Sequence, residues 1–187
     1  MPPGHALLIQ TMKSPPEPSR QALADLHDSA YRWALTCTGF DEEHAHEVLQ
    51  MVYLEILGGR AVYEGRSSLK TWLFAVIRNT ALRLAATARR ARALEDRLAD
   101  AAEDAAADAC AHELSRRQTR QAILSALETL SPQQRQIIEL TYYHELTVAE
   151  AARVMGITLG SARQHFHRAK RTLTDALWPM REALGDV

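Results

Sequence analysis

The chain has 187 residues, with 22 Lys or Arg, 23 Asp or Glu and a formal net charge of −1 at pH 7. Glycine and proline are sparse, at 8 and 7 residues, and alanine and leucine are abundant, so the composition predicts an all-α protein of one domain or two small ones. No apolar run approaches a membrane span and the first residues show no signal-peptide pattern, which argues against direct membrane insertion.

The near-neutral total conceals blocks of opposite charge. Residues 78–92 contain five arginines and no acidic residue, whereas residues 95–113 contain seven acidic residues and one arginine. We therefore predict a basic helix followed by a flexible, acidic, Ala-rich linker over residues 93–115. Residues 1–19 hold five of the seven prolines and are expected to form a mobile leader.

Cysteine and histidine usage argues against a metal or cofactor site. Cys37 and Cys110 lie far apart in the chain, and Cys37 falls in an apolar helical pattern, which predicts a reduced core cysteine and a cytoplasmic location. His44 and His46 would point about 160° apart on a helix and could not share a metal. The chain also lacks a glycine-rich phosphate loop and a nucleophile–base set, so we expect no cofactor, no metal and no enzymatic activity.

Two helices are predicted in the first part of the chain, over residues 20–38 and about 42–57, with Asp41 as the cap of the second. Part of the second helix surface is rather apolar for a solvated face. That surface carries Gln50, Met51, Leu54 and Glu55. This pattern indicates either a partner-binding strip or packing inside a small bundle.

A loop over residues 60–68 and a helix over residues 69–89 follow. The loop carries Tyr63, Arg66, Ser67 and Ser68. The core stripe of the helix is Leu69, Trp72, Leu73, Val76, Ile77 and Thr80, with Arg78 and Asn79 projecting elsewhere. Aromatic residues beside Arg and Asn are typical of single-strand DNA surfaces, in which rings stack on bases and arginines hold phosphates. Plain core packing is the alternative role for the Trp72 ring.

Helix-start and helix-stop signals dominate the second part of the chain, which begins near residue 116. An apolar helix ends near Leu130, and Ser131-Pro-Gln-Gln134 and Thr147-Val-Ala-Glu150 are capping boxes. Gly156 stands where a helix ends in a left-handed residue, and Thr158 would cap the final helix. Two short helices joined by this turn predict a helix-turn-helix.

The final helix, residues 159–177, has an apolar stripe and an opposite face without acidic residues. The stripe is Ala162, Phe166, Ala169, Leu173 and Leu177. The opposite face carries Ser161, Gln164, Arg168 and Arg171, with His167 beside them and Arg163 and Lys170 flanking the stripe. Arg and Gln read base edges in the major groove, and Lys and Arg hold phosphates. A solvated basic helix is the alternative, and the preceding turn favours DNA.

Three stretches make the chain resemble the extracytoplasmic-function (ECF) sigma factors, small members of the bacterial sigma-70 class. Residues 46–57 (HEVLQMVYLEIL) are similar to the family's polymerase-gripping helix, and residues 67–82 (SSLKTWLFAVIRNTAL) resemble its promoter-melting segment. Residues 130–173 are similar to its −35-reading domain. The resemblance implies two helical domains, a region 2-like domain over 20–92 and a region 4-like domain over 116–187.

The resemblance also implies three sets of contact residues. Core RNA polymerase would be bound through its clamp helices and flap, with Glu47, Gln50, Met51, Leu54 and Glu55 on the clamp side. The −10 element would be read and melted by Tyr63, Arg66, Ser67, Ser68, Trp72, Arg78 and Asn79. The −35 element would be bound by Ser161, Arg163, Gln164, His167, Arg168, Lys170 and Arg171.

The function implied is that of a promoter-specificity subunit, regulated by an anti-sigma factor that is often membrane-anchored. The chain departs from the family at Met51 and His46, where acids are usual, and at Arg83, where Asp is frequent. A stand-alone transcription regulator is the competing reading, but it would need neither residues 46–57 nor residues 63–79. The sequence leaves open how the two domains sit relative to each other without polymerase.

Overall fold

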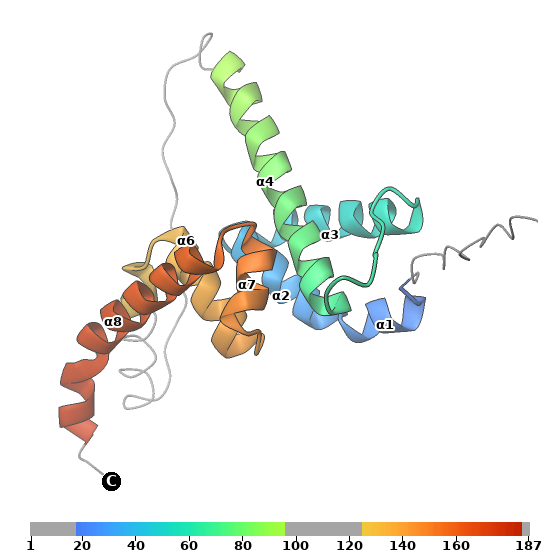
Figure 1. Ribbon diagram of the computed structural model, residues 1–187. Coiled ribbons are helices and arrows are strands. Elements are labelled where there is room, and N and C mark those ends of the chain that lie inside the picture. The colour runs from blue at the N-terminus through green and yellow to red at the C-terminus, as the bar shows by residue number, and fades with distance from the viewer. Residues whose placement is uncertain (1–17, 96–124, 185–187) are drawn as a thin grey trace, which may run out of the picture.

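The computed structural model describes residues 18–95 and 125–184 (Figure 1). Its elements are α1 (Arg20–Asp25), α2 (His27–Cys37), α3 (Glu42–Leu57), α4 (Leu69–Glu95), α6 (Pro132–Ile138), the π-helical turn η1 (Glu139–Tyr143), α7 (Val148–Met155) and α8 (Leu159–Leu184). Every regular element in these ranges is a helix, which confirms the all-α prediction. The expected leader up to residue 17 and the expected linker from residue 96 onward lie outside the described residues.

Helices α1 to α4 form the first unit, and two of their boundaries differ from the prediction. The helix expected over 20–38 is two helices, because the backbone at Leu26 turns (φ −94°, ψ −3°) between α1 and α2. Helix α3 has the expected bounds, and the Asp41 carboxylate caps it by accepting from the His44 N–H at 2.9 Å. Helix α4 runs beyond Arg89 to Glu95, since Ala and Arg favour a helix and no Gly or Pro interrupts the run.

The second unit confirms the predicted helix signals. Ser131 and Thr147 each accept from the backbone N–H three residues on, and the side chains of Gln134 and Glu150 accept in return from the cap N–H groups. Gly156 has φ +64°, the left-handed conformation that favours glycine. The N–H groups of residues 156 and 157 then bond back into α7, to the carbonyls of residues 153 and 152, as in a Schellman motif.

One element of the second unit has no counterpart among the predicted helices. Between α6 and α7 the chain forms η1, in which the His144 N–H donates to the Glu139 carbonyl at 3.0 Å, five residues back. π-helical turns are rare and appear mostly as single turns associated with α-helices. Here the insertion accompanies the burial of His144, which is only 2% exposed.

The larger of two apolar clusters in the described residues runs through both units. Trp33 and Phe74 are fully buried and their rings stack with centroids 5.8 Å apart, and the Trp33 Nε1–H donates to the Phe74 carbonyl at 3.0 Å. The His144 ring meets Phe74 edge-on at 4.7 Å. Buried residues of the second unit in the same core include Ile137, Leu140 and Met155. Helix α7 consequently lies beside α4 (Figure 1).

A smaller cluster fixes α8 on α6, through Leu130, Ile138 and Ala169. Cys37 is a free thiol packed partly buried against the main core, and burial raises its pKa. Cys110 lies outside the described residues. Over residues 18–95 and 125–184, no helix combines the length and the apolar character that crossing a bilayer requires.

Candidate nucleic-acid interface

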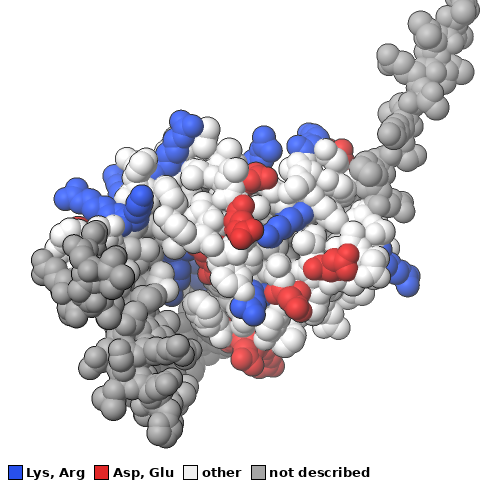
Figure 2. Space-filling view, turned by 90° about the horizontal axis from the view of Figure 1, so that it is seen from below, with Lys and Arg blue, Asp and Glu red and all other residues white. Residues whose placement is uncertain are grey.

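Helix α8 is divided into a buried and an exposed side as its pattern predicted. Ala162 and Ala169 are fully buried, and Phe166 and Leu173 pack partly buried beside them. The predicted DNA-contacting residues other than Ser161 are exposed: Arg163, Gln164, His167, Arg168, Lys170 and Arg171. In Figure 2 several Lys and Arg side chains gather at the upper left of the molecule, with little red among them.

The start of α8 is fixed by Thr158. Its hydroxyl accepts from the Ser161 N–H at 3.1 Å and shares a hydrogen bond of 2.9 Å with the Ser161 hydroxyl. Ser161 is therefore partly buried and holds the helix end as well as facing the predicted DNA side. Near the middle of α8, Arg171 Nε lies 3.8 Å from Asp175 Oδ2, and both side chains are more than 70% exposed. Such an exposed pair contributes little and leaves Arg171 accessible.

The loop before α4 is braced by its own side chains. The Tyr63 hydroxyl donates to the Ser67 carbonyl at 2.6 Å, and its ring lies 5.3 Å from the ring of Trp72. The Ser68 hydroxyl caps α4 by accepting from the Thr71 N–H at 3.2 Å, and Arg66 pairs with Glu64. Trp72 is partly buried against the core, so its ring combines core packing with support of the loop.

The residues predicted to read the −10 element fall into two groups. The first group lies at and before the start of α4 and contains Tyr63, Ser67, Ser68 and Trp72, with Asn79 exposed further along the helix. Arg78 instead faces the second unit, where its Nε–H donates to Gln136 Oε1 at 3.1 Å. Burial lowers the pKa of this guanidinium.

The predicted polymerase surface on α3 is partly accessible. Glu47, Gln50 and Leu54 are exposed, Leu54 by 56%, whereas Met51 and Glu55 are partly buried. Glu55 Oε1 accepts from Arg83 Nη2 at 2.6 Å. Arg83 therefore links α4 to the surface of α3 that is predicted to bind polymerase. Sequence reasoning noted Arg83 only as a departure from the family pattern.

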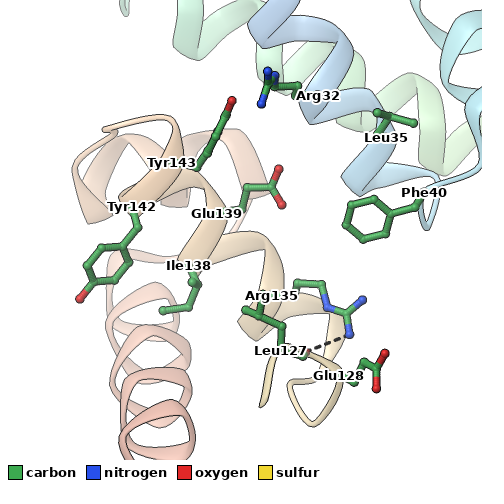
Figure 3. A pocket seen from close by; sticks show the side chains of 10 residues that line it. All are labelled: Arg32, Leu35, Phe40, Leu127, Glu128, Arg135, Ile138, Glu139, Tyr142 and Tyr143. Carbon is green, nitrogen blue, oxygen red and sulfur yellow. Dashed lines mark hydrogen bonds between the residues drawn. The ribbon is translucent and has the colours of Figure 1, made fainter. Parts of the chain in front are cut away.

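Sequence reasoning missed a pocket of about 650 Å³ between α2 and the α6–η1 segment (Figure 3). Its apolar lining consists of Leu35, Phe40, Leu127, Ile138, Tyr142 and Tyr143. Four charged residues surround this lining: Arg32, Glu128, Arg135 and Glu139. Tyr142 and Phe40 are 63% and 58% exposed, and Arg32 lies over the Tyr143 ring at 5.2 Å from its centroid. Because the two walls are far apart in the sequence, no local pattern could have indicated it.

Two electrostatic features accompany this junction. Burial lowers the pKa of His144 to about 4, and Lys70 and Arg32 lower it further. Burial raises the pKa of Glu139. Across residues 18–95 and 125–184, no three His, Cys, Asp or Glu side chains come together as a metal site. His44 pairs with the Asp41 carboxylate at 2.8 Å, which raises the pKa of His44.

Comparisons with known proteins agree with this architecture. Residues 23–93 match sigma-70 region 2 and residues 120–173 match sigma-70 region 4, about two thirds of the chain together. The ECF RNA polymerase sigma factor SigX of Bacillus subtilis (strain 168) is 25% identical over 152 residues, covering 78% of this chain and 77% of SigX. RNA polymerase sigma factor YlaC of the same organism is 24% identical over 166 residues, covering 87% of this chain and 96% of YlaC.

A solved structure has the same fold. The sigma factor RpoE from Bartonella quintana, in complex with the anti-sigma factor NepR, is 23% identical and superposes with a TM-score of 0.61, covering 87% of this chain and 98% of that one. Sigma-70 family members are transcription initiation factors rather than catalytic enzymes. With both sigma-70 regions present in order on an all-helical fold, this chain belongs to the ECF subfamily of the sigma-70 family.

Proposed function

We propose that this protein binds core RNA polymerase and directs it to specific promoters, reading the −35 element with α8 and the −10 element with the loop and α4 of the first unit. The observation that carries the proposal is the exposed face of α8, which holds arginines, a lysine and a glutamine on a helix preceded by a capped turn. The region 2-like surface in the same chain distinguishes this function from simple duplex binding.

The chemistry of α8 suits a major groove. Arg168 and Gln164 are exposed on the side opposite the buried alanines. There the Arg168 guanidinium can pair with a guanine edge and the Gln164 amide with an adenine edge. Arg163 and Lys170 flank them and can hold phosphates on either side. The first unit adds a braced loop beside Trp72 and the exposed Asn79, which suits an unstacked strand.

Polymerase would be engaged by α3, whose exposed Glu47, Gln50 and Leu54 form a mixed acidic and apolar strip. The Glu55–Arg83 ion pair links this strip to α4. The polymerase flap would contact the second unit. We expect no catalytic activity from the protein itself, and we place its work in the cytoplasm with the polymerase that it serves.

An anti-sigma factor is proposed as the regulatory partner, because RpoE, which shares the fold, was solved with one. The pocket between α2 and α6–η1 supports this proposal, since its aromatic lining is exposed and spans both units. Co-expression with the protein encoded next to it should yield a complex that Tyr142→Ala weakens. If neither the wild type nor any variant co-purifies with that protein, the pairing is wrong.

The test of the main proposal is run-off transcription with core polymerase on genomic promoter fragments, including the protein's own promoter. Arg168→Ala should reduce specific transcripts on the order of tenfold or more, because a bidentate base contact contributes ~1–3 kcal/mol of discrimination. Binding to core polymerase should not change. Arg20→Ala, an exposed arginine of α1, is the matched control and should leave transcription unaffected.

A stand-alone regulator would give the opposite pattern. Such a protein would bind a duplex site tightly without polymerase, and adding it to core polymerase would produce no new transcripts. Arg168→Ala would then weaken duplex binding, and substitutions on α3 such as Gln50→Ala would have no effect in either assay. That set of results would replace the sigma-factor function with the regulator.

A further inference from the structure

The pocket between α2 and the α6–η1 segment has the size and the position of a small-molecule site. Such sites usually measure about 300–1,000 Å³, are lined mainly by apolar and aromatic side chains with a few polar groups, and often lie between domains. This pocket measures about 650 Å³ and takes its walls from both units. In Figure 3 the ring of Phe40 and the carboxylate of Glu139 extend towards each other from the two walls.

Phe40 stands at this pocket at the cost of backbone strain. Its φ is +69°, in the left-handed region that bulky side chains rarely adopt. The Phe40 N–H donates to the Leu35 carbonyl at 2.7 Å, which fixes this conformation at the end of α2. Glycine would adopt it without strain, so any advantage of phenylalanine lies in its ring. Because Phe40 is 58% exposed, that ring is available to a ligand in the pocket.

The carboxylate of Glu139 has no charged partner in the described parts of the chain. Its side chain is only 20% exposed, and burial raises its pKa more than Thr36 and Arg135 lower it. His144 Nε2 lies 3.8 Å from Glu139 Oε1, but the pKa of His144 is about 4, so the ring is neutral near neutral pH. An ammonium group in the pocket would supply the missing counter-charge.

Arg135 provides a charge of opposite sign on the same wall. It precedes Glu139 by four residues, and the Glu139 N–H donates to the Arg135 carbonyl, so the two side chains lie one helical turn apart. Arg135 Nη2 donates to the Leu127 carbonyl at 2.9 Å, which orients the guanidinium without neutralising it (Figure 3). A carboxylate in the pocket could therefore pair with Arg135.

We propose that this pocket binds a small zwitterion, an α-amino acid with a large apolar side chain. The ligand's ammonium pairs with Glu139, its carboxylate pairs with Arg135, and its side chain packs in the apolar lining beside Phe40. A ligand with only one of the two charges leaves either Glu139 or Arg135 without a counter-charge. Binding of this ligand does not depend on the promoter function proposed above.

Small probes separate the three chemical parts of the ligand. Isothermal titration calorimetry of the full-length protein with L-phenylalanine should show one saturable site. The amine 2-phenylethylamine lacks the carboxylate and 3-phenylpropanoate lacks the ammonium. Each should bind roughly tenfold or more weakly, because bonds between charged groups are among the stronger ones. L-alanine keeps both charges but lacks the ring, and it should also bind more weakly.

Glu139→Gln removes the charge and keeps the shape of the side chain. It should bind L-phenylalanine roughly tenfold more weakly than wild type. L-phenylalanine should also lose its advantage over 3-phenylpropanoate in this variant, a coupling that a purely structural role of Glu139 would not produce. Glu128→Gln is the matched control, because this carboxylate lines the pocket but is exposed and screened by solvent. It should leave the affinity unchanged.

Phe40→Gly tests the contribution of the strained residue. Glycine relieves the left-handed backbone, so the melting temperature measured by circular dichroism should stay close to that of wild type. The affinity for L-phenylalanine should fall severalfold, because the ring no longer covers the ligand. Saturating L-phenylalanine should raise the melting temperature of wild type more than that of Phe40→Gly or Glu139→Gln.

Three results would overturn the inference. The first is the absence of saturable L-phenylalanine binding up to millimolar concentrations, which would leave the pocket to the partner protein proposed above. The second is equal affinity for L-phenylalanine and for either singly charged probe. The third is equal affinity in Glu139→Gln and Glu128→Gln. These measurements use neither DNA nor polymerase, so a failure of the promoter function, seen as missing transcripts, is distinguished from a failure of ligand binding.

Discussion

Trp33→Ala is expected to lower the free energy of unfolding by ~3–5 kcal/mol, the usual cost of removing a large aromatic side chain from a core. Trp33 is fully buried, stacks on Phe74 and meets His144 edge-on at 6.1 Å. The substitution also removes the indole N–H that donates to the Phe74 carbonyl. Because the ring touches both units, we expect their contact to loosen together with the first unit.

Urea unfolding followed by circular dichroism measures this loss. Leu57→Ala is the control, because Leu57 is 63% exposed at the end of α3 and should cost little. Trp33→Phe should fall between the two, since it keeps a ring but loses the hydrogen bond. A Trp33→Ala variant as stable as Leu57→Ala would contradict the continuous core described for the two units.

Acidification is expected to destabilise the folded protein through His144. Its pKa in the fold is about 4, against an ordinary value of 6.5, so the unfolded chain binds the proton more readily. The stability that depends on neutral His144 is therefore fully present above about pH 6.5 and is lost as the pH falls towards 4. The whole effect is at most ~3 kcal/mol, of which roughly 2 kcal/mol should be lost by pH 5.

Urea unfolding at several values between about pH 7 and pH 5 tests this dependence. His144→Leu should flatten the profile, because the ring's Nε2 lacks a hydrogen-bond partner in the fold and leucine suits the Phe74 and Trp33 surroundings. Burial raises the pKa of Glu139, so the protonation of this carboxylate on acidification favours the folded state and offsets part of the loss caused by His144. The test is therefore the difference between wild type and His144→Leu.

His44→Gln provides a control of opposite sign. The pKa of His44 is raised by Asp41, so its charged form contributes stability below about pH 6.5 that is lost as the pH rises. Removing it should make the loss on acidification slightly larger. If His144→Leu and wild type have parallel profiles, His144 is not buried as the structure places it.

Several elements followed from the sequence because their signals are local. Each of these signals depends on residues within a few positions of one another. They are the capping boxes at Ser131 and Thr147, the glycine turn at Gly156 and the bounds of α3. The two sides of α8 followed from a 3.6-residue period, and its alanines are buried where that period places them. The surface that we propose for −35 reading could thus be named from the sequence alone.

The surface that we propose to read the −10 element was harder to predict from the sequence. Tyr63 and Trp72 could be placed near each other because only a short loop separates them. The engagement of Arg78 by Gln136 could not be predicted, since the two residues are 58 positions apart in the chain. The ion pair between Glu55 and Arg83 likewise joins two helices whose relative rotation no local pattern specifies.

The sequence by itself determined the all-helical class, the capped starts of α3, α6 and α7 and the basic face of α8, because propensity, capping and periodicity act over a few residues. It did not determine the break at Leu26 or the ends of α4 and α8, which run on to Glu95 and Leu184. Only the tertiary structure decided that Phe74 is core, that a π-turn accompanies the burial of His144, and that the two units share one apolar centre. Phe74 lies off the core stripe predicted for α4 within the first unit. It is buried between Trp33 of α2 and His144 of the second unit, and contacts with residues so distant in the chain leave no local signal in the sequence.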